Sequence, residues 1–175
     1  MKRLLCCLLA LCLLAMASAR AEDGDDPALE DLRQWLLGEY DAWIEIPYSS
    51  DNKCYLLPRE SEKFGIITIQ LNLFTNLQIA IVTCNNLVTY APENALEVSR
   101  ICNRLNQRWK CLCFINDTSS HTVSIGTKAP YLRAEDVSEV VSNLTAPIWD
   151  AIDDMQAQFG HLDCTGLFAK SGWRE

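Results

Sequence analysis

The sequence predicts an α+β fold in which one antiparallel sheet carries its helices on a single face. The segments follow one another as helix, four strands, helix, two strands and helix. The spacing of apolar residues changes between a period of two and a period near 3.6 along these segments, as expected for strands and amphipathic helices. No internal repeat, low-complexity block or linker divides the chain. We therefore expect one folded domain over residues 22–160, followed by a tail over residues 161–175.

The first 21 residues have the three-part plan of a secretory signal peptide. Lys2 and Arg3 precede an apolar run from Leu4 to Ala17, and small residues follow. The run is shorter than the roughly 20 residues that a membrane span needs. We therefore expect export to the periplasm or secretion, with no stable membrane insertion.

The position of cleavage stays open between two sites, after Ala19 and after Ala21. A lipoprotein alternative would use Cys12, but the bulky Leu11 stands where a small residue is expected. Removal of residues 1–21 takes away three of the 15 basic residues and none of the 23 acidic ones. The remaining 12 basic and 23 acidic residues give a net charge of −11, which argues against nucleic acid as a partner.

Apolar periodicity places each predicted element along the chain. In the third strand, Ile67, Ile69 and Leu71 alternate with polar residues, which is typical of a sheet with one buried face. Pro147 is expected to kink or split the last helix, and Cys164 to tether an otherwise coiled tail. Helices are expected over Pro27 to Leu37, Ala91 to Trp109 and Ala134 to Phe159, and strands over Trp43 to Ile46, Cys54 to Leu57, Gly65 to Leu73, Leu77 to Cys84, Lys110 to Ile115 and Thr122 to Ile125.

Six cysteines remain after the signal peptide, and in an oxidising compartment they permit up to three disulfides. Residues i and i+2 of a strand lie about 6.6 to 7 Å apart, near the upper limit for a disulfide. Cys111 and Cys113 are therefore not expected to pair with each other, whereas Cys102 on the preceding helix could bridge to either. The candidate disulfide cysteines are Cys54, Cys84, Cys102, Cys111, Cys113 and Cys164.

A redox or metal site built from Cys102, Cys111 and Cys113 is the alternative interpretation. Structural zinc needs four ligands, commonly in two short-spaced pairs, and a redox dithiol needs the spacing C-x-x-C at a helix start. Neither pattern is present, and His121 and His161 have no spacing that completes a site. The acidic pairs Glu135-Asp136 and Asp153-Asp154 diverge around their helices and predict solvated faces. We expect no enzyme, no metal and no cofactor.

The order of elements and the segment ALEVSRICNRLNQRWKCLCFIND, continued by HTVSIGTKAPYLRAEDVSEVVSNL, resemble the YbjN family of bacterial sensory transduction regulators. The resemblance spans roughly Leu29 to Phe159. It rests on Asn103 and Asn106 flanking Leu105, on a strand that ends in Asn-Asp, and on a strand that leaves through Ala-Pro. Members look like type III secretion chaperones in fold, which implies a one-sheet module suited to protein binding and often dimeric.

Two sets of residues receive a predicted role. Asn103 and Asn106 lie next to the helix C-terminus and are expected to act as structural caps that bond loose backbone groups. Leu112 and Phe114 alternate with the cysteines and are the candidate partner-binding face of the sheet. The predicted function is an exported, non-enzymatic protein-binding module, regulatory or chaperone-like, whose partner is another protein or a second copy in a homodimer.

Overall fold

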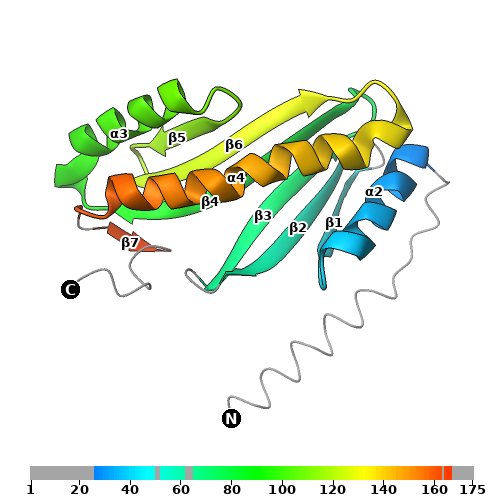
Figure 1. Ribbon diagram of the computed structural model, residues 1–175, viewed down its shortest axis with the longest axis horizontal. Helices are drawn as coiled ribbons and strands as arrows, with labels where there is room; N and C mark the ends of the chain where they lie inside the picture. Colours follow the sequence, from blue (N-terminus) through cyan, green and yellow to red (C-terminus); the bar gives the residue numbers. More distant parts are fainter. Residues whose placement is uncertain (1–25, 50–51, 62–64, 163, 167–175) are drawn as a thin grey trace, which may run out of the picture.

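The described part of the chain forms one antiparallel sheet that is covered on one face by three helices (Figure 1). A computed structural model describes residues 26–49, 52–61, 65–162 and 164–166. The predicted α+β class and the order of its elements are confirmed. The predicted signal peptide, with Cys12 and both cleavage sites, and residues 167–175 of the tail lie outside the described residues.

None of the helices in the described ranges is both long and apolar enough to cross a bilayer.

The observed elements extend several of the predicted segments. The elements are α2 (Pro27–Glu39), β1 (Ile44–Ser49), β2 (Asn52–Ser61), β3 (Gly65–Phe74), β4 (Ile79–Tyr90), η1 (Pro92–Asn94), α3 (Ala95–Arg108), β5 (Cys113–Asp117), β6 (Thr122–Pro130), η2 (Ala134–Asp136), α4 (Val137–Phe159) and β7 (Cys164–Gly166).

The strands lie in the order β1-β2-β3-β4-β6-β5, and β7 pairs with β4. The first four strands form the predicted antiparallel meander. After β4 the chain passes through α3, so that β5 lies at the edge and β6 returns between β5 and β4. The prediction of a coiled tail is wrong at Cys164–Gly166, because these residues pair with β4 from Val88 to Tyr90.

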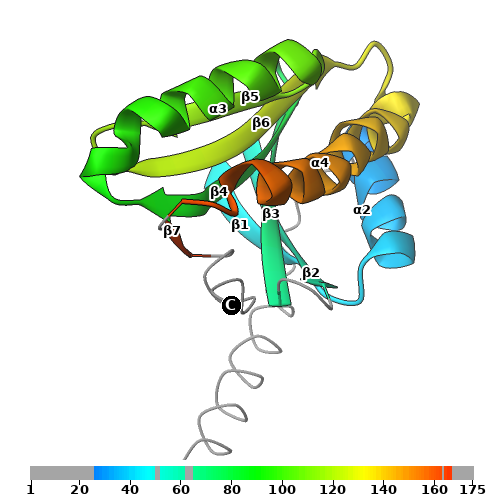
Figure 2. The same ribbon diagram turned by 60° about the vertical axis from the view of Figure 1, so that its left-hand side comes forward.

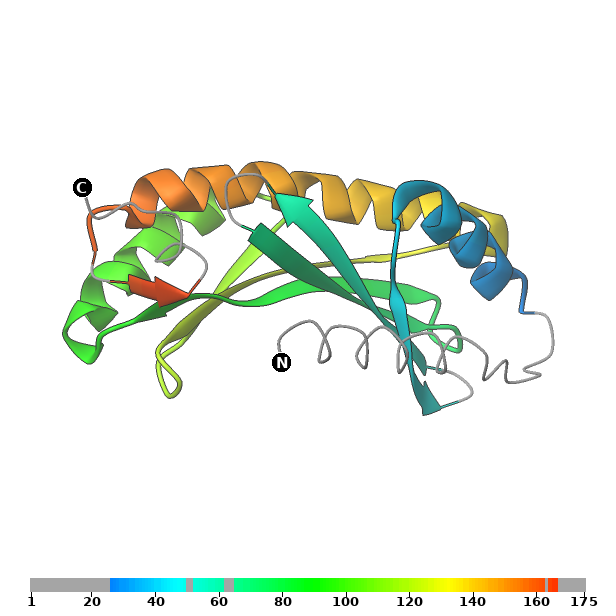
Figure 3. The same cartoon turned by 90° about the horizontal axis from the view of Figure 1, so that it is seen from below.

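The core lies between the sheet and the helices. In β3, Ile67, Ile69 and Leu71 are at most 1% exposed, as their alternation predicts. On the same side of the sheet, α3 packs on β5, and α4 packs on β4 and β6. Each helix buries one stripe, from Val98 to Leu105 in α3 and from Val137 to Phe159 in α4. Figure 3 shows α2, α3 and α4 on the same side of the sheet. The burial of apolar side chains from both layers is what holds the helices to this face.

Pro147 lies inside α4, which continues without a break from Val137 to Phe159. The expectation that this proline would split the helix is wrong. A proline cannot donate to the carbonyl four residues earlier, and here that carbonyl belongs to Asn143, which is exposed. Water can therefore bond the freed carbonyl, while the buried residues on either side of Pro147 keep both halves of the helix on the core.

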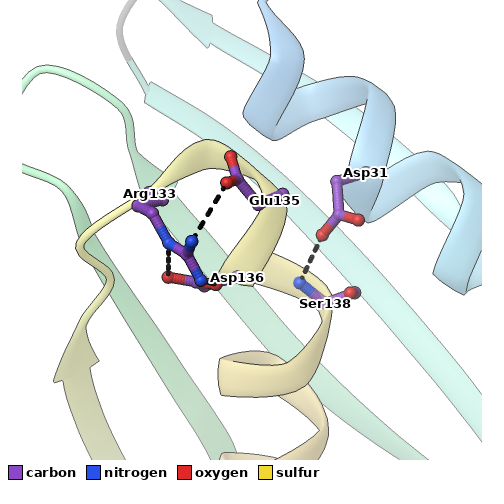
Figure 4. Close-up of polar contacts among 5 residues, drawn as sticks. All are labelled: Asp31, Arg133, Glu135, Asp136 and Ser138. Atoms are coloured by element: carbon purple, nitrogen blue, oxygen red, sulfur yellow. Dashed lines mark hydrogen bonds and ion pairs between the residues drawn. The ribbon is translucent and has the colours of Figure 1, made fainter.

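The start of α4 is capped by a residue from α2 (Figure 4). The Ser138 backbone N–H donates to Asp31 Oδ2 at 2.7 Å, although the two residues are 107 positions apart. The N-cap residue of α4, Asp136, makes no capping bond of its own, because Arg133 Nε and Nη2 donate to its two carboxylate oxygens at 3.1 and 2.9 Å. The carboxylate of Asp31 thus satisfies a free helix donor and joins the two helices.

The C-terminal half of α4 is joined to the end of α3, and Figure 2 shows the two helices side by side across the sheet. Arg108 Nη1 donates to Asp154 Oδ1 at 2.9 Å, and Trp109 Nε1 donates to Asp154 Oδ2 at 2.8 Å. The side chain of Asp154 is only 11% exposed. The expectation of a solvated face is therefore wrong for Asp154, whose carboxylate holds α3 to α4.

Candidate protein-interaction face

The sheet face opposite the helices, here called the outer face, has no described helix over it (Figure 3). Strand register decides which residues lie on it, because residues directly opposite in an antiparallel pair point to the same side. Two rows cross the outer face from β1 toward β5. One row contains Ile44, Leu56, Gln70, Thr83, Gly126 and Cys113, and the other contains Ile46, Cys54, Asn72, Ile81 and Lys128. Cys54 and Gly126 are buried, and the other nine are half-buried or exposed.

A ladder of side-chain amides occupies the centre of the outer face. Asn85 Nδ2 donates to Gln70 Oε1 at 3.2 Å, and Gln70 Nε2 donates to Asn72 Oδ1 at 3.3 Å. Asn85 Nδ2 also lies 3.4 Å from its acceptor Thr83 Oγ1. Each amide keeps further donor or acceptor capacity, because a carboxamide offers two donors and two lone pairs. The ladder therefore presents neutral hydrogen-bonding groups toward solvent.

Apolar side chains flank the ladder on both sides. On β1 and β2, Ile46 and Leu56 are half-buried, and on β4 Ile81 is half-buried as well. Ile115 on β5 is 48% exposed, and Ile66 on β3 is 72% exposed. Lys128 is the one charged residue among the eleven in the two rows. Depletion of charge beside apolar and neutral polar groups is characteristic of the central part of protein–protein interfaces.

The predicted partner-binding residues Leu112 and Phe114 do not lie on this face. They are 6% and 3% exposed and belong to the core, whereas Cys113 and Ile115 point outward. That prediction is wrong, and the physical reason is the side of the strand that α3 covers. Every second residue from Leu112 faces α3, so the cysteines of this segment take the solvent side.

The outward orientation of this segment's cysteines also separates them from Cys102, to which one of them was expected to form a disulfide. Cys102 is buried on the core side of α3, while Cys111 and Cys113 are exposed, and no disulfide joins any of the three. Cys111 precedes β5 in a turn and is not part of the strand. Cys54 and Cys84 are buried thiols that form no disulfide. Cys164 is buried on β7.

The buried thiols are poor nucleophiles in this environment. Burial raises the pKa of Cys84 to about 12 and that of Cys102 to about 11. Burial also raises the pKa of Cys54, against a smaller opposing effect of its hydrogen bond with Gln70. The thiolate is the reactive form of cysteine, so these three side chains are suited to packing.

Asn106 bonds the edge strand, and this contact differs in form from the predicted cap. Phe114 N–H donates to Asn106 Oδ1 at 2.7 Å, and Asn106 Nδ2 donates to Phe114 O at 3.1 Å. The carboxamide thus pairs with β5 as a neighbouring strand would, on the edge that β6 leaves open. The helix end itself is closed by Trp109 N–H, which donates to Leu105 O. Asn103 is exposed.

A second polar chain links β4, β5 and α3. Tyr90 Oη donates to Asn116 Oδ1 at 2.6 Å, Asn116 Nδ2 donates to Ser99 Oγ at 2.9 Å, and Ser99 Oγ donates to a helix carbonyl, that of Ala95, at 2.8 Å. Burial raises the pKa of Tyr90. Because the chain ends on a backbone carbonyl of α3, it fixes the strands to the helix.

The two histidines are placed apart from the cysteines. His121 lies in the β5–β6 hairpin with a positive φ of 55°, and its ring centre is 5.5 Å from that of Tyr90. His161 is exposed after α4. Within the described ranges no three His, Cys, Asp or Glu side chains are grouped so as to hold a metal ion. The three-cysteine redox or metal cluster considered from the sequence is not assembled.

Comparisons with known proteins find similarity at the level of structure. No protein-family model matches the sequence. No curated protein matches it significantly. The solved structure of YbjN from E. coli matches with a TM-score of 0.52 and 17% identity, over 74% of this chain and 91% of that one. An uncharacterized protein from Methanothermobacter thermautotrophicus matches with a TM-score of 0.50 and 12% identity, over 75% and 99%.

These likenesses show that the chain has a YbjN-like fold. At such low identity they carry over the arrangement of sheet and helices and no residue role. The resemblance inferred from the sequence is thus confirmed at the level of the fold. The chemistry of the outer face has to be argued from its own residues.

Proposed function

We propose that the protein is an exported, non-enzymatic protein-binding module, and that its outer face is the binding surface. The observation that carries the proposal is the composition of that face: eleven residues in two rows with a single charge, on the side of the sheet that no described helix covers. In the whole sequence 22% of residues are charged, against one of the eleven positions in these rows, and Asp117 adds a charge further along β5 on the same side.

The mixture of groups on the face favours a protein as the partner. The amide ladder of Asn85, Gln70 and Asn72 can exchange hydrogen bonds with a polypeptide, while Ile81 and Ile115 bury apolar area on contact. A net charge of −8 for the full chain opposes binding of nucleic acid or anionic lipid. The YbjN-like fold supports the same choice, because the resemblance to the YbjN family implies a module of the secretion-chaperone kind.

The polar chain from Tyr90 and the buried thiols have structural roles in the described residues. The polar chain from Tyr90 ends on a helix carbonyl, and the buried thiols have raised pKa values. Export follows from the signal-peptide pattern of residues 1–21, and it would place the module in the periplasm or outside the cell.

Site-specific photocrosslinking tests the proposal in the cells that produce the protein. A photoreactive amino acid at Ile81 or Ile115 should form a covalent adduct with one protein of defined mass. The same group at Leu132, which is 84% exposed in the segment between β6 and η2, serves as the matched control and should form none. Because both surfaces are accessible, a difference in crosslinking reports binding and not exposure.

The mass of the adduct separates the two kinds of partner. An adduct of twice the chain mass identifies a homodimer, in which the same face meets itself about a two-fold axis. An adduct of any other mass identifies a client or regulator. Equal crosslinking at Leu132, or none at Ile81 and Ile115, would count against the outer face as the binding surface.

A further inference from the structure

The fold divides the described cysteines into two chemical classes. Cys54, Cys84, Cys102 and Cys164 are at most 7% exposed, and burial raises the pKa of the first three thiols. Cys111 and Cys113 are exposed, and they stand two positions apart in the chain. An external reagent therefore meets two thiols at one place on the surface, while the others can react only after local opening of the fold.

The local structure holds this pair of thiols at the surface. Leu112, between the two cysteines, is buried in the core and anchors the backbone. Thr127 Oγ1 donates to the carbonyl of Cys111 at 2.7 Å, so the chain at this point still runs beside β6. Opposite Cys113 lies Gly126, which has no side chain to cover the sulfur. The thiols are thus fixed in place and open to solvent.

Two cations lie next to the pair in a protein that is acidic as a whole. Lys110 precedes Cys111 in the chain, and Lys128 follows Gly126 by two residues on the outer face. Thr127, which bonds the carbonyl of Cys111, is the residue just before Lys128 in the chain. Both lysines are exposed. A small anion that approaches the thiols would be attracted by these two positive charges.

We propose that Cys111 and Cys113 form a thiol–disulfide exchange site for anionic low-molecular-weight disulfides. The thiolate of one cysteine attacks a sulfur of the incoming disulfide RS–SR. A protein–S–S–R bond forms as the RS–SR bond breaks, and RS⁻ leaves with the electron pair and takes up the proton that the protein thiol released. The incoming disulfide is the oxidant. The inference does not require the proposed binding function, although Cys113 and Lys128 lie on the outer face, where a bound partner would cover them.

Tryptic mapping of the full chain tests the site, because cleavage after Lys and Arg separates the cysteines. Residues 111–128 carry both exposed thiols, residues 101–104 carry Cys102, and residues 54–59 carry Cys54. With oxidised glutathione under native conditions, we expect adducts on peptide 111–128 at a rate roughly 100-fold above the other two. In denaturant all three peptides should react, which confirms that the buried cysteines are thiols. Single C111S and C113S variants identify the reacting sulfur.

The charge of the disulfide provides the second test. Oxidised glutathione is anionic and cystamine is cationic, so the ratio of their rate constants measures the local field. Lys128→Gln should lower that ratio about threefold at low salt, which is the order of magnitude for the loss of one nearby unit charge in water. Arg133→Gln removes the same charge from the start of α4 and should leave the ratio unchanged. Equal labelling of peptide 101–104 in the native protein, or a ratio that Lys128→Gln does not move, overturns the proposal.

Discussion

Replacing Asn106 by alanine should weaken the edge of the sheet, because its carboxamide is the only described partner of the Phe114 backbone on that side of β5. The variant removes two hydrogen bonds, of 2.7 and 3.1 Å, and leaves both an N–H and a carbonyl of Phe114 without them. The substitution retains helix propensity, since alanine is the best helix former. The expected effect is therefore on the contact between α3 and β5 and not on α3 itself.

The size of the effect follows from the number and setting of the bonds. A net hydrogen bond contributes about 1 kcal/mol, and half-buried Asn106 leaves room for water to reach the freed groups in part. Asn106→Ala should thus lower the free energy of unfolding by about 2 kcal/mol. In a domain of this length the same change lowers the melting temperature by roughly 4 to 8 °C.

Urea unfolding followed by tryptophan fluorescence measures this difference, and Asn103→Ala is the matched control. Asn103 lies on the same helix and is exposed, so its variant should stay within about 0.5 kcal/mol of the original. Asn106→Asp should lose the bond that Nδ2 donates and keep the acceptor. Its free energy of unfolding should therefore lie between those of Asn106→Ala and Asn103→Ala. If Asn106→Ala costs no more than Asn103→Ala, the carboxamide does not hold β5 and the reasoning is refuted.

Three further substitutions have expected outcomes. Asp31→Ala removes the cap of α4 and should lower the free energy of unfolding by about 1 kcal/mol in urea. Asp154→Ala removes the acceptor of two side chains and should cost roughly 2 kcal/mol, while exposed Asp150→Ala should cost less than about 0.5 kcal/mol. Between pH 9 and pH 11 the original protein should lose about 2 kcal/mol of stability through Cys84, and the Cys84→Val variant should not show this loss. An unfolded thiol ionises near pH 9, whereas burial holds the folded pKa at about 12, so stability from this group is full below pH 9 and falls as pH rises.

Each of these expectations has its own contrary result. An Asp31→Ala variant as stable as the original would mean that water caps Ser138 equally well. Equal costs at Asp154 and Asp150 would show that the link between α3 and α4 adds no stability. An alkaline loss that is the same with and without Cys84 would place the responsible group elsewhere.

Much of the fold could be predicted from the sequence because its elements carry strong periodic patterns. The alternation of Ile67, Ile69 and Leu71 with polar neighbours fixed both the extent of β3 and its buried side. The stripe from Val98 to Leu105 did the same for α3. The three residues of β7 have no such pattern, and they pair with β4 only because the end of α4 delivers the chain there. Periodicity cannot report a strand whose position depends on a neighbouring helix.

The polar contacts that fasten the elements could not be predicted, because each joins positions far apart in the chain. Asp31 reads as one acid among several in an amphipathic helix, yet it caps Ser138 across 107 residues. Asp154 reads as half of a solvated pair, yet it accepts from Arg108 and Trp109. The prediction for Asn106 was partly correct. Its place at a helix end predicted a bond to backbone groups, and the side chain does bond backbone groups, but those of Phe114 in β5.

The sequence could not show which face of β5 is buried, for a different reason. That choice decides where a partner can bind. Cys111, Cys113 and Ile115 alternate with Leu112 and Phe114, so both faces of this segment are apolar and its pattern cannot say which one is buried. Packing settles the choice, because Leu112 and Phe114 fill space beneath α3 that a thiol would leave partly empty. The larger side chains take the core, and the cysteines with Ile115 take the outer face. This exchange moves the candidate interface from two buried residues to a surface that a partner, or a small disulfide, can reach.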